Sequence, residues 1–315
     1  MRVLVVGAGA VGGYFGGRLL AAGRDVTFLV RPARAAALQA DGLVVRTLDG
    51  DDVVVPEPAT VQAGELAGAG GFDAVLLSVK AYALEQALDD LAPAIGAKTF
   101  VVPALNGVRH IDVLRERFGA GRVVGGVCVV AAQVEPDGSI RQVGAGNSLS
   151  YGEFDGSISD RMLELDASLT GAGFRTRISQ TIDLDLWEKW VMLASGGSLT
   201  TLMRSTVGSI VAAPGGLALA TGLAEECFAV ATAAGFPPRE TQRAFVLDTL
   251  TAEGSTFGTS MFRDLMGGAE VESDQIVGDL VARAGVLGVP VPLLSLANTN
   301  LSVYRAERAA RLGWS

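Results

Sequence analysis

The first 31 residues constrain the fold of this chain more than any other segment. Arg2–Val6 is a short apolar run without polar alternation, which is typical of a strand buried on both faces. The glycine-rich segment Gly7–Gly12 (GAGAVG) follows directly, a helical pattern continues to about Ala22, and a second strand is expected at Asp25–Val30. The order of strand, glycine loop, helix and strand predicts a Rossmann-type dinucleotide-binding unit.

Each glycine of the loop has an expected mechanical role. Gly7 permits the tight turn from strand to helix, Gly9 lets a pyrophosphate approach the backbone, and Gly12 lets the helix pack closely on the strand. The pyrophosphate would accept hydrogen bonds from N–H groups at the positive end of the helix. The alternative is a glycine-rich turn that binds no ligand. We assign the whole loop to the cofactor: Gly7, Ala8, Gly9, Ala10, Val11 and Gly12.

The residue after the second strand predicts which dinucleotide binds. NAD sites usually carry Asp or Glu about 20 residues after the glycines, where the carboxylate bonds the ribose 2′-hydroxyl. This chain has Arg31 instead, with Arg34 one turn later. A guanidinium cannot accept from a hydroxyl but pairs well with a 2′-phosphate. We therefore expect NADP rather than NAD; the alternative is two solvated arginines on a surface loop.

Composition excludes several classes of function. A net charge of −9 argues against general nucleic-acid binding, and the chain has no uninterrupted apolar run of the length that a membrane span needs. Met1 leads straight into a strand rather than a signal segment, so a cytoplasmic protein is expected. Cys128 and Cys227 are isolated and fit buried free thiols. The single histidine, His110, makes a His-based triad improbable and excludes a His-rich metal site.

The pattern of elements predicts two domains. Up to about residue 180 strands alternate with helices, as in an open parallel sheet. Strands at Leu43–Arg46 and Val53–Val55, joined around Asp49 and Gly50, are expected to form a hairpin inserted after the second βα unit, and Val134–Val143 a second hairpin. Buried strands are expected at Asp73–Val79, Thr99–Val102 and Val123–Val130, and helices at Leu184–Leu193, Ala218–Ala234 and Asp274–Ala284. We expect an α/β domain over residues 1–180, an all-α domain over residues 181–315, and the active site in the cleft between them. A homodimer is possible, but apolar helix stripes are equally explained by the core.

Lysine usage points to one residue that could titrate. Of 25 basic residues 22 are Arg, and an arginine effectively cannot lose its proton. Lys189 stands in an apolar helical pattern, where desolvation can lower the pKa of an ammonium toward neutrality, as a general acid or base requires. The alternative is a structural ion pair with Asp185, four residues earlier.

Further polar residues stand at predicted element ends. Lys80 and Asn106 follow strands of the parallel sheet, where ligands collect, although a solvated Lys and an Asn-Gly turn explain them equally. Glu272 lies near the start of the helix at Asp274, where a simple helix-start role is the default. Glu270 and Asp274 compete with Glu272 for any functional role.

Together these segments resemble the ketopantoate reductase family over essentially the whole chain. The resemblance rests on GAGAVG, Arg31, SVKAY around Lys80, LNG around Asn106, WEKW around Lys189, and the segment SMFRDLMGGAEVES that contains Glu272. It implies a Rossmann-type domain followed by a helical domain, as in 6-phosphogluconate-dehydrogenase-like folds. It also implies NADPH-dependent reduction of a 2-oxo acid, in the namesake case 2-dehydropantoate to pantoate in pantothenate biosynthesis.

The resemblance also implies roles for individual residues. Lys189 would donate the proton to the carbonyl oxygen and contact the substrate. Asn106 and Lys80 would contact the nicotinamide end of the cofactor and the substrate. Glu272 would contact the cofactor or a substrate hydroxyl, and Ser260 the region of the substrate carboxylate.

The sequence departs from the family where the substrate is recognised. Family members typically follow the helix lysine with Asn at the fourth and eighth positions and carry another Asn further on, but here these are Leu193, Gly197 and Val207. Leu105 also replaces the usual Gln before Asn106. Buried hydrogen bonds of this kind can set large discrimination factors. Two alternatives therefore stay open: a same-family reductase for a different, more apolar carbonyl substrate, and an NADP-binding protein without catalysis.

Overall fold

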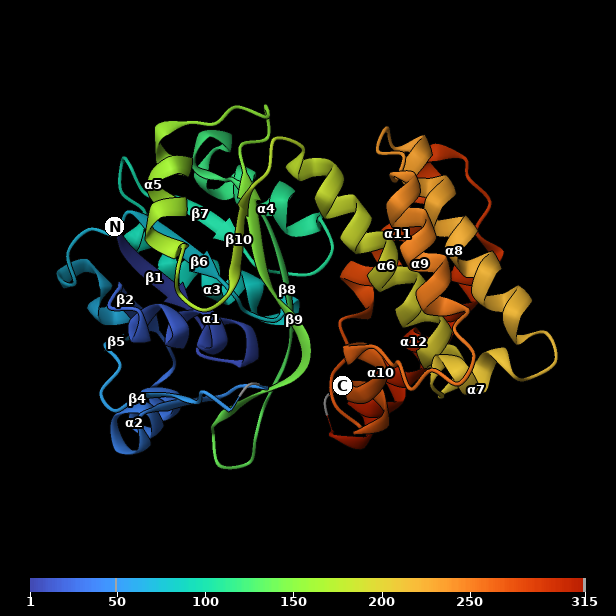
Figure 1. Ribbon diagram of the computed structural model, residues 1–315, viewed down its shortest axis with the longest axis horizontal. Helices are drawn as coiled ribbons and strands as arrows, with labels where there is room; N and C mark the ends of the chain where they lie inside the picture. Colours follow the sequence, from blue (N-terminus) through green and yellow to red (C-terminus); the bar gives the residue numbers. More distant parts are fainter. Residues whose placement is uncertain (49, 314–315) are drawn as a thin grey trace. The chain divides into compact units, whose positions relative to one another are not determined.

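The computed structural model describes residues 1–48 and 50–313 and divides into two units (Figure 1). One unit comprises Met1–Leu105 and His110–Ile182, and the other comprises Asn106–Arg109 and Asp183–Ser315. The sequence placed the boundary between residues 180 and 181. It gave no sign that the four residues after the strand at Phe100–Pro103 group with the helical unit.

The first unit contains the expected parallel sheet. Its strands are β1 (Arg2–Val6), β2 (Asp25–Leu29), β5 (Thr60–Val61), β6 (Ala74–Leu77) and β7 (Phe100–Pro103). They lie in the order β5-β2-β1-β6-β7, and each neighbouring pair is parallel. This is a doubly wound order, which reverses between β1 and β6, and in such sheets ligands bind beyond the carboxyl ends of the strands at that point. The parallel-sheet prediction is confirmed.

Helices cover this sheet because both of its faces are apolar. They are α1 (Ala10–Ala21), α2 (Pro32–Asp41), α3 (Leu84–Leu91), α4 (Arg109–Phe118) and α5 (Asp160–Leu169). One core cluster joins Phe15 of α1 to Val5 of β1 and to Leu165 of α5. A second cluster joins Leu88 of α3 to Leu4 of β1, whose side chain points to the opposite face. Short 3₁₀ helices lie at η1 (Ala63–Gly68), η2 (Ala81–Ala83), η3 (Ala92–Ala94) and η4 (Ala120–Arg122).

A second sheet, not predicted from the sequence, lies beside the first. It runs β10 (Arg175–Ile178), β9 (Ile140–Gly152), β3 (Leu43–Arg46) and β4 (Val53–Val55), and β8 (Gly125–Val134) also pairs with β9. Both expected hairpins are present, since β3 pairs with β4 and β8 with β9 in antiparallel fashion. The second hairpin is much longer than expected, and β3 joins β9 in parallel. The sequence did not predict that the two hairpins join in a sheet of their own. The predicted turn residue Asp49 lies outside the described residues.

Helix α1 packs between the two sheets through its glycines. A Cβ at Gly16 would lie 2.5 Å from Cζ of Phe28 on β2, and a Cβ at Gly13 would lie 2.0 Å from Cδ1 of Ile140 on β9. Both glycines are buried. The glycine-rich sequence that continues past the loop therefore serves close packing of α1.

The second unit is helical, as predicted. Its helices are α6 (Ile182–Met203), α7 (Val207–Val211), α8 (Gly216–Ala233), α9 (Glu240–Leu250), α10 (Ser260–Met266), the π-helix η5 (Asp274–Gly278), α11 (Asp279–Leu287) and α12 (Pro292–Arg311). Helix α8 contacts α9, α11 and α12. Its length and composition would also suit a membrane span, but buried core helices share these properties, and its Leu223 and Cys227 are fully buried. Cys128 and Cys227 are free and buried, as predicted.

Candidate functional site

The glycine loop has the geometry that an anion site requires. Gly7 has a φ of +92°, in the left-handed region that favours glycine. Helix α1 begins at Ala10 without a side-chain cap on its first N–H groups, and its first turn holds no acidic residue. A Cβ at Gly9 would meet nothing within 4 Å, so the space in front of the loop is open. The loop therefore fits the pyrophosphate of a dinucleotide.

Gly12 is packed tightly against the rest of the loop and against Ser78. A Cβ at this position would lie 2.1 Å from the carbonyl oxygen of Gly7 and 2.1 Å from Oγ of Ser78. The Ser78 hydroxyl, just past β6, donates to the carbonyl oxygen of Val6 at 2.8 Å. Ser78 thus joins the ends of β1 and β6 beneath the loop. Sequence reasoning overlooked Ser78, although it begins the SVKAY segment.

The two predicted phosphate-binding arginines differ in their surroundings. Arg31 is exposed and precedes α2. Arg34 is partly buried: its Nε donates to the carbonyl oxygen of Ala8 at 3.2 Å, and its Nη2 to that of Gly138 at 3.2 Å. Burial lowers the pKa of the Arg34 guanidinium. Arg34 therefore lies against the glycine loop itself, which the sequence did not indicate.

Two predicted site residues that lie 166 positions apart are in contact. Nδ2 of Asn106 donates to Oε2 of Glu272 at 3.3 Å, and only 7% of Glu272 is exposed. Gly107 has a φ of +77°, and a Cβ there would lie 2.4 Å from the carbonyl oxygen of Gln275. The left-handed turn at Gly107 and its close approach to η5 therefore position the Asn106 amide beside Glu272.

The competing carboxylates have other partners. Glu270 accepts from Arg308 at 2.6 Å and also pairs with Arg305 of α12. Asp274 accepts from Arg305 as well. These contacts bind both carboxylates to the last helix, so Glu272 is the member of the trio that meets a predicted site residue.

Lys189 lies near the middle of α6 beside an anchored tryptophan. Nε1 of Trp190 donates to the carbonyl oxygen of Ile276 in η5 at 2.8 Å, which fixes α6 against the turn that follows Glu272. Lys189 itself is half-buried. The predicted apolar neighbours are buried apart from Leu193, which is half-buried: Leu186, Trp187, Trp190 and Val191. The helical unit thus positions Lys189, Asn106 and Glu272 through α6, η5 and the loop after β7.

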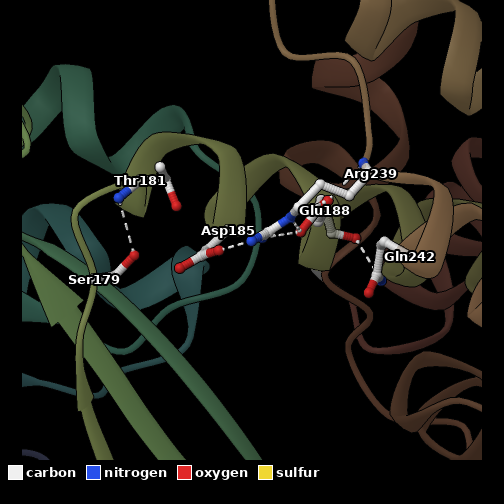
Figure 2. A network of polar contacts seen from close by, with 6 residues as sticks. All are labelled: Ser179, Thr181, Asp185, Glu188, Arg239 and Gln242. Atoms are coloured by element: carbon white, nitrogen blue, oxygen red, sulfur yellow. Dashed lines mark hydrogen bonds and ion pairs between the residues drawn. The ribbon is translucent and has the colours of Figure 1, made fainter.

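Two acidic residues that precede Lys189 on α6 are bound by Arg239, which precedes the first residue of α9. Figure 2 shows Arg239 reaching both carboxylates: Nη2 donates to Oδ1 of Asp185 at 2.5 Å, and Nε to Oε1 of Glu188 at 2.9 Å. Asp185 and Glu188 are 6% and 5% exposed. These bonds raise the pKa of Arg239. Just before α6, the N–H of Thr181 donates to Oγ of Ser179.

The remaining predicted residues lie at the starts of short helices. Lys80 is exposed and follows β6 at the beginning of η2. Ser260 is exposed and is the first residue of α10, which Thr259 caps by accepting from the N–H of Phe262 at 3.2 Å.

The positions that depart from the family pattern fall into two groups. Leu193 is half-buried and Gly197 is buried, one and two turns beyond Lys189 on α6. A Cβ at Gly197 would lie 2.5 Å from Cε of Met261 on α10. Val207, in contrast, is fully buried in the core, and its N–H donates to the carbonyl oxygen of Phe257 at 3.0 Å.

Family models match both units of this chain. The model described as "Ketopantoate reductase PanE/ApbA" matches residues 3–156, and the model described as "Ketopantoate reductase PanE/ApbA C terminal" matches residues 181–304. The chain belongs to the ketopantoate reductase family. It is therefore an oxidoreductase of a family whose cofactor is a nicotinamide dinucleotide.

Individual relatives agree with this assignment. An uncharacterized oxidoreductase, YkpB, of Bacillus subtilis is 35% identical over 98% of this chain and 100% of its own length. A 2-dehydropantoate 2-reductase of Mesorhizobium japonicum is 32% identical over 93% of this chain and 94% of its own.

Solved structures share the fold. A PanE/ApbA family ketopantoate reductase from Ralstonia eutropha has a TM-score of 0.86 at 28% identity, covering 98% of this chain and 99% of its own. D-mandelate dehydrogenase, solved with NADH and anilino(oxo)acetate, has a TM-score of 0.85 at 21% identity with the same coverage.

Proposed function

We propose that this protein reduces a 2-oxo acid to the 2-hydroxy acid with NADPH. The first substrate to test is 2-dehydropantoate, the substrate of the family's namesake reaction in pantothenate biosynthesis. The observation that carries the proposal is the contact between Asn106 and the buried Glu272, next to the turn that anchors the Lys189 helix. A pure dinucleotide-binding protein has little need for these groups. Family membership and the 2-dehydropantoate 2-reductase relative support the same reaction class. We expect the reaction to take place in the cytoplasm.

Each residue of the proposed site has its own role in the reaction. A nicotinamide dinucleotide held by the glycine loop would supply hydride to the carbonyl carbon. Lys189 protonates the carbonyl oxygen, and its positive charge stabilises the negative charge that develops there. Glu272 accepts one Asn106 N–H, which fixes the amide so that its second N–H and its oxygen remain for cofactor or substrate. The glycine loop binds the pyrophosphate. Lys80 contacts the nicotinamide end of the cofactor, and Ser260 contacts the region of the substrate carboxylate.

The preference for NADPH rests on the arginines after β2. Arg34 is held at the loop through the Ala8 carbonyl, and Arg31 is exposed beside it at the start of α2. Neither side chain can accept from a ribose hydroxyl, whereas both can donate to a 2′-phosphate.

The test is to follow NADPH absorbance with ketopantoate and with a panel of other 2-oxo acids, with NADH as control and a binding titration for each cofactor. Turnover with NADPH supports the proposal. Tight NADPH binding without turnover on any physiological carbonyl would instead favour a non-catalytic binding protein. Tighter binding of NADH would overturn the cofactor assignment.

A further inference from the structure

Helix α6 exposes one short face near Lys189. Along its described residues 185–201, all side chains are buried except those of Lys189, Met192 and Leu193. Residues spaced by three and four positions lie on the same side of a helix. Between residues 185 and 201 the accessible face of α6 therefore presents one ammonium group and, next to it, two apolar side chains.

The same stripe stays apolar one turn further on. Gly197 follows Leu193 by four residues, and the methyl group of Met261 occupies the space that a side chain at position 197 would need. Met261 is 3% exposed, so this methyl group is part of a packed wall. Where an amide could have met a substrate oxygen, the protein places a thioether methyl.

The hydroxyl groups beyond Lys189 on α6 do not replace the missing amides. Those of Ser195, Thr200 and Thr201 donate to the carbonyl oxygens four residues earlier, at 2.7 Å in each case. Ser198 lies nine residues from Lys189 and thus on the opposite side of the helix. The described part of this face therefore offers no free hydroxyl proton beside Met192 and Leu193.

We propose that Met192 and Leu193, backed by Met261, form the surface that receives the substrate side chain and selects 2-oxo acids whose side chain is branched, apolar and free of hydroxyl groups. The inference rests on the proposed reductase function and names its substrate class. A hydroxyl group buried on this surface loses its hydrogen bonds to water without a partner, which is unfavourable. An apolar pocket lowers kcat/KM for a substrate with an added hydroxyl by about 100-fold at most. A pocket built to hydrogen-bond a hydroxyl discriminates far more strongly against a substrate that lacks it.

Two substrates isolate this effect. Trimethylpyruvate and ketopantoate differ by one hydroxyl group on an otherwise identical branched side chain. We expect kcat/KM with NADPH to be about 10- to 100-fold higher for trimethylpyruvate. The corresponding products should differ in the same direction when titrated calorimetrically into the enzyme saturated with NADP, which measures binding independently of turnover.

Substitutions on the proposed surface should reverse the preference. Leu193→Asn replaces the apolar side chain with an amide of similar shape, and we expect the trimethylpyruvate-to-ketopantoate ratio of kcat/KM to fall by about 10-fold or more. Met192→Gln should act in the same direction and provides a second variant if the first folds poorly. Leu217→Asn, at a 53% exposed leucine of α8, is the matched control and should leave the ratio unchanged.

The outcomes separate this inference from the proposed function. A ratio that favours trimethylpyruvate, and falls in Leu193→Asn or Met192→Gln, supports the inference. Turnover that favours ketopantoate, or a ratio that neither variant changes, overturns the inference while leaving the reductase function intact. No NADPH oxidation with either acid or with the panel of other 2-oxo acids, together with no binding of either product, overturns both.

Discussion

At the residue scale, Lys189 is the group on which the proposed chemistry depends. Lys189→Met keeps the length of the side chain but removes its proton and charge. We expect kcat to fall by about 100- to 10,000-fold, since general acid catalysis contributes that much, while NADPH affinity stays largely unchanged. Steady-state kinetics and a fluorescence titration of NADPH measure the two effects. Lys98→Met, at an exposed lysine of the first unit, is the matched control. Loss of NADPH binding in Lys189→Met would make Lys189 structural.

Also at the residue scale, Arg34 should distinguish the two cofactors. Its contacts with the carbonyl oxygens of Ala8 and Gly138 hold the guanidinium against the glycine loop. Arg34→Ala should raise the Kd for NADPH by about 10-fold or more, because a charge-assisted hydrogen bond contributes about 1.5–3 kcal/mol, and should change the Kd for NADH much less. The exposed Arg175 supplies the control Arg175→Ala. Equal weakening of both cofactors would show that Arg34 only supports the loop.

At the scale of elements, two glycines at the start of α1 should separate stability from cofactor binding. Gly12→Ala places a Cβ 2.1 Å from backbone and should lower the free energy of unfolding by about 1–3 kcal/mol or more. Gly9→Ala meets nothing within 4 Å, so it should fold normally yet weaken NADPH binding by filling the space of the pyrophosphate. Urea unfolding and an NADPH titration of both variants make the comparison. Equal stability of the two would contradict the packing role of Gly12.

The connection between β9 and α5 should be sensitive to acid. Glu153 is 8% exposed and accepts from Arg161 and Ser159, and the Arg161 bond above all lowers the pKa of Glu153. Its contribution to stability is therefore present above its unfolded pKa of about 4.3 and is lost as the pH falls through the lower folded value.

Glu153→Gln should therefore destabilise the protein at neutral pH by about 1–3 kcal/mol, and the difference from wild type should shrink below about pH 4. Urea unfolding across this pH range measures the difference. Glu164→Gln, at an exposed glutamate of α5, is the control and should show no such trend. A deficit that stays constant across the range would contradict the linkage.

What the sequence could predict depends on how locally each element is determined. Strand β1 and the hairpin β3–β4 were predicted at their observed bounds because short apolar runs and turn residues are local signals. The pairing of β9 with β3 joins segments about 100 residues apart, and Gly144, Gly146 and Asn147 weaken the strand pattern of β9. The start of the helix at Asp274 is a π-helix, which the stripe of Ile276, Leu280 and Ala284 does not distinguish from an α-helix.

The site shows the same division. The glycine loop, Lys189 and Glu272 could be identified as candidates because each belongs to a recognisable segment. The contact between Asn106 and Glu272, by contrast, joins residues 166 positions apart and has no local signal. The hydrogen bond from Arg34 to the carbonyl oxygen of Ala8 could not be predicted either. The spacing of residues in the helix after β2 does not show in which direction a long side chain extends.

At the scale of the whole molecule, cofactor should protect the glycine loop and the arginine segment much more than helix α8. The loop and arginines that we assign to the dinucleotide all belong to the first unit, whereas α8 is in the second. In hydrogen–deuterium exchange, NADPH should therefore slow the exchange of residues 7–21 and 31–38 and leave that of residues 216–233 nearly unchanged. The reason is that a ligand stabilises the folded conformation of the segments to which it binds. Protection centred on residues 216–233 would contradict the placement of the cofactor.

The four residues Asn106–Arg109, which group with the helical unit although β7 precedes them in the first, limit how such a protein can be recombined. A chimera made by exchanging the C-terminal half at residue 183 would take Asn106 and Glu272 from different parents, and likewise Gly107 and Gln275. Exchange of the helical half alone should therefore disturb the contacts that position Asn106. Grafts between relatives should require the loop after β7 to travel with the helices, so the two halves of the gene are expected to diverge together.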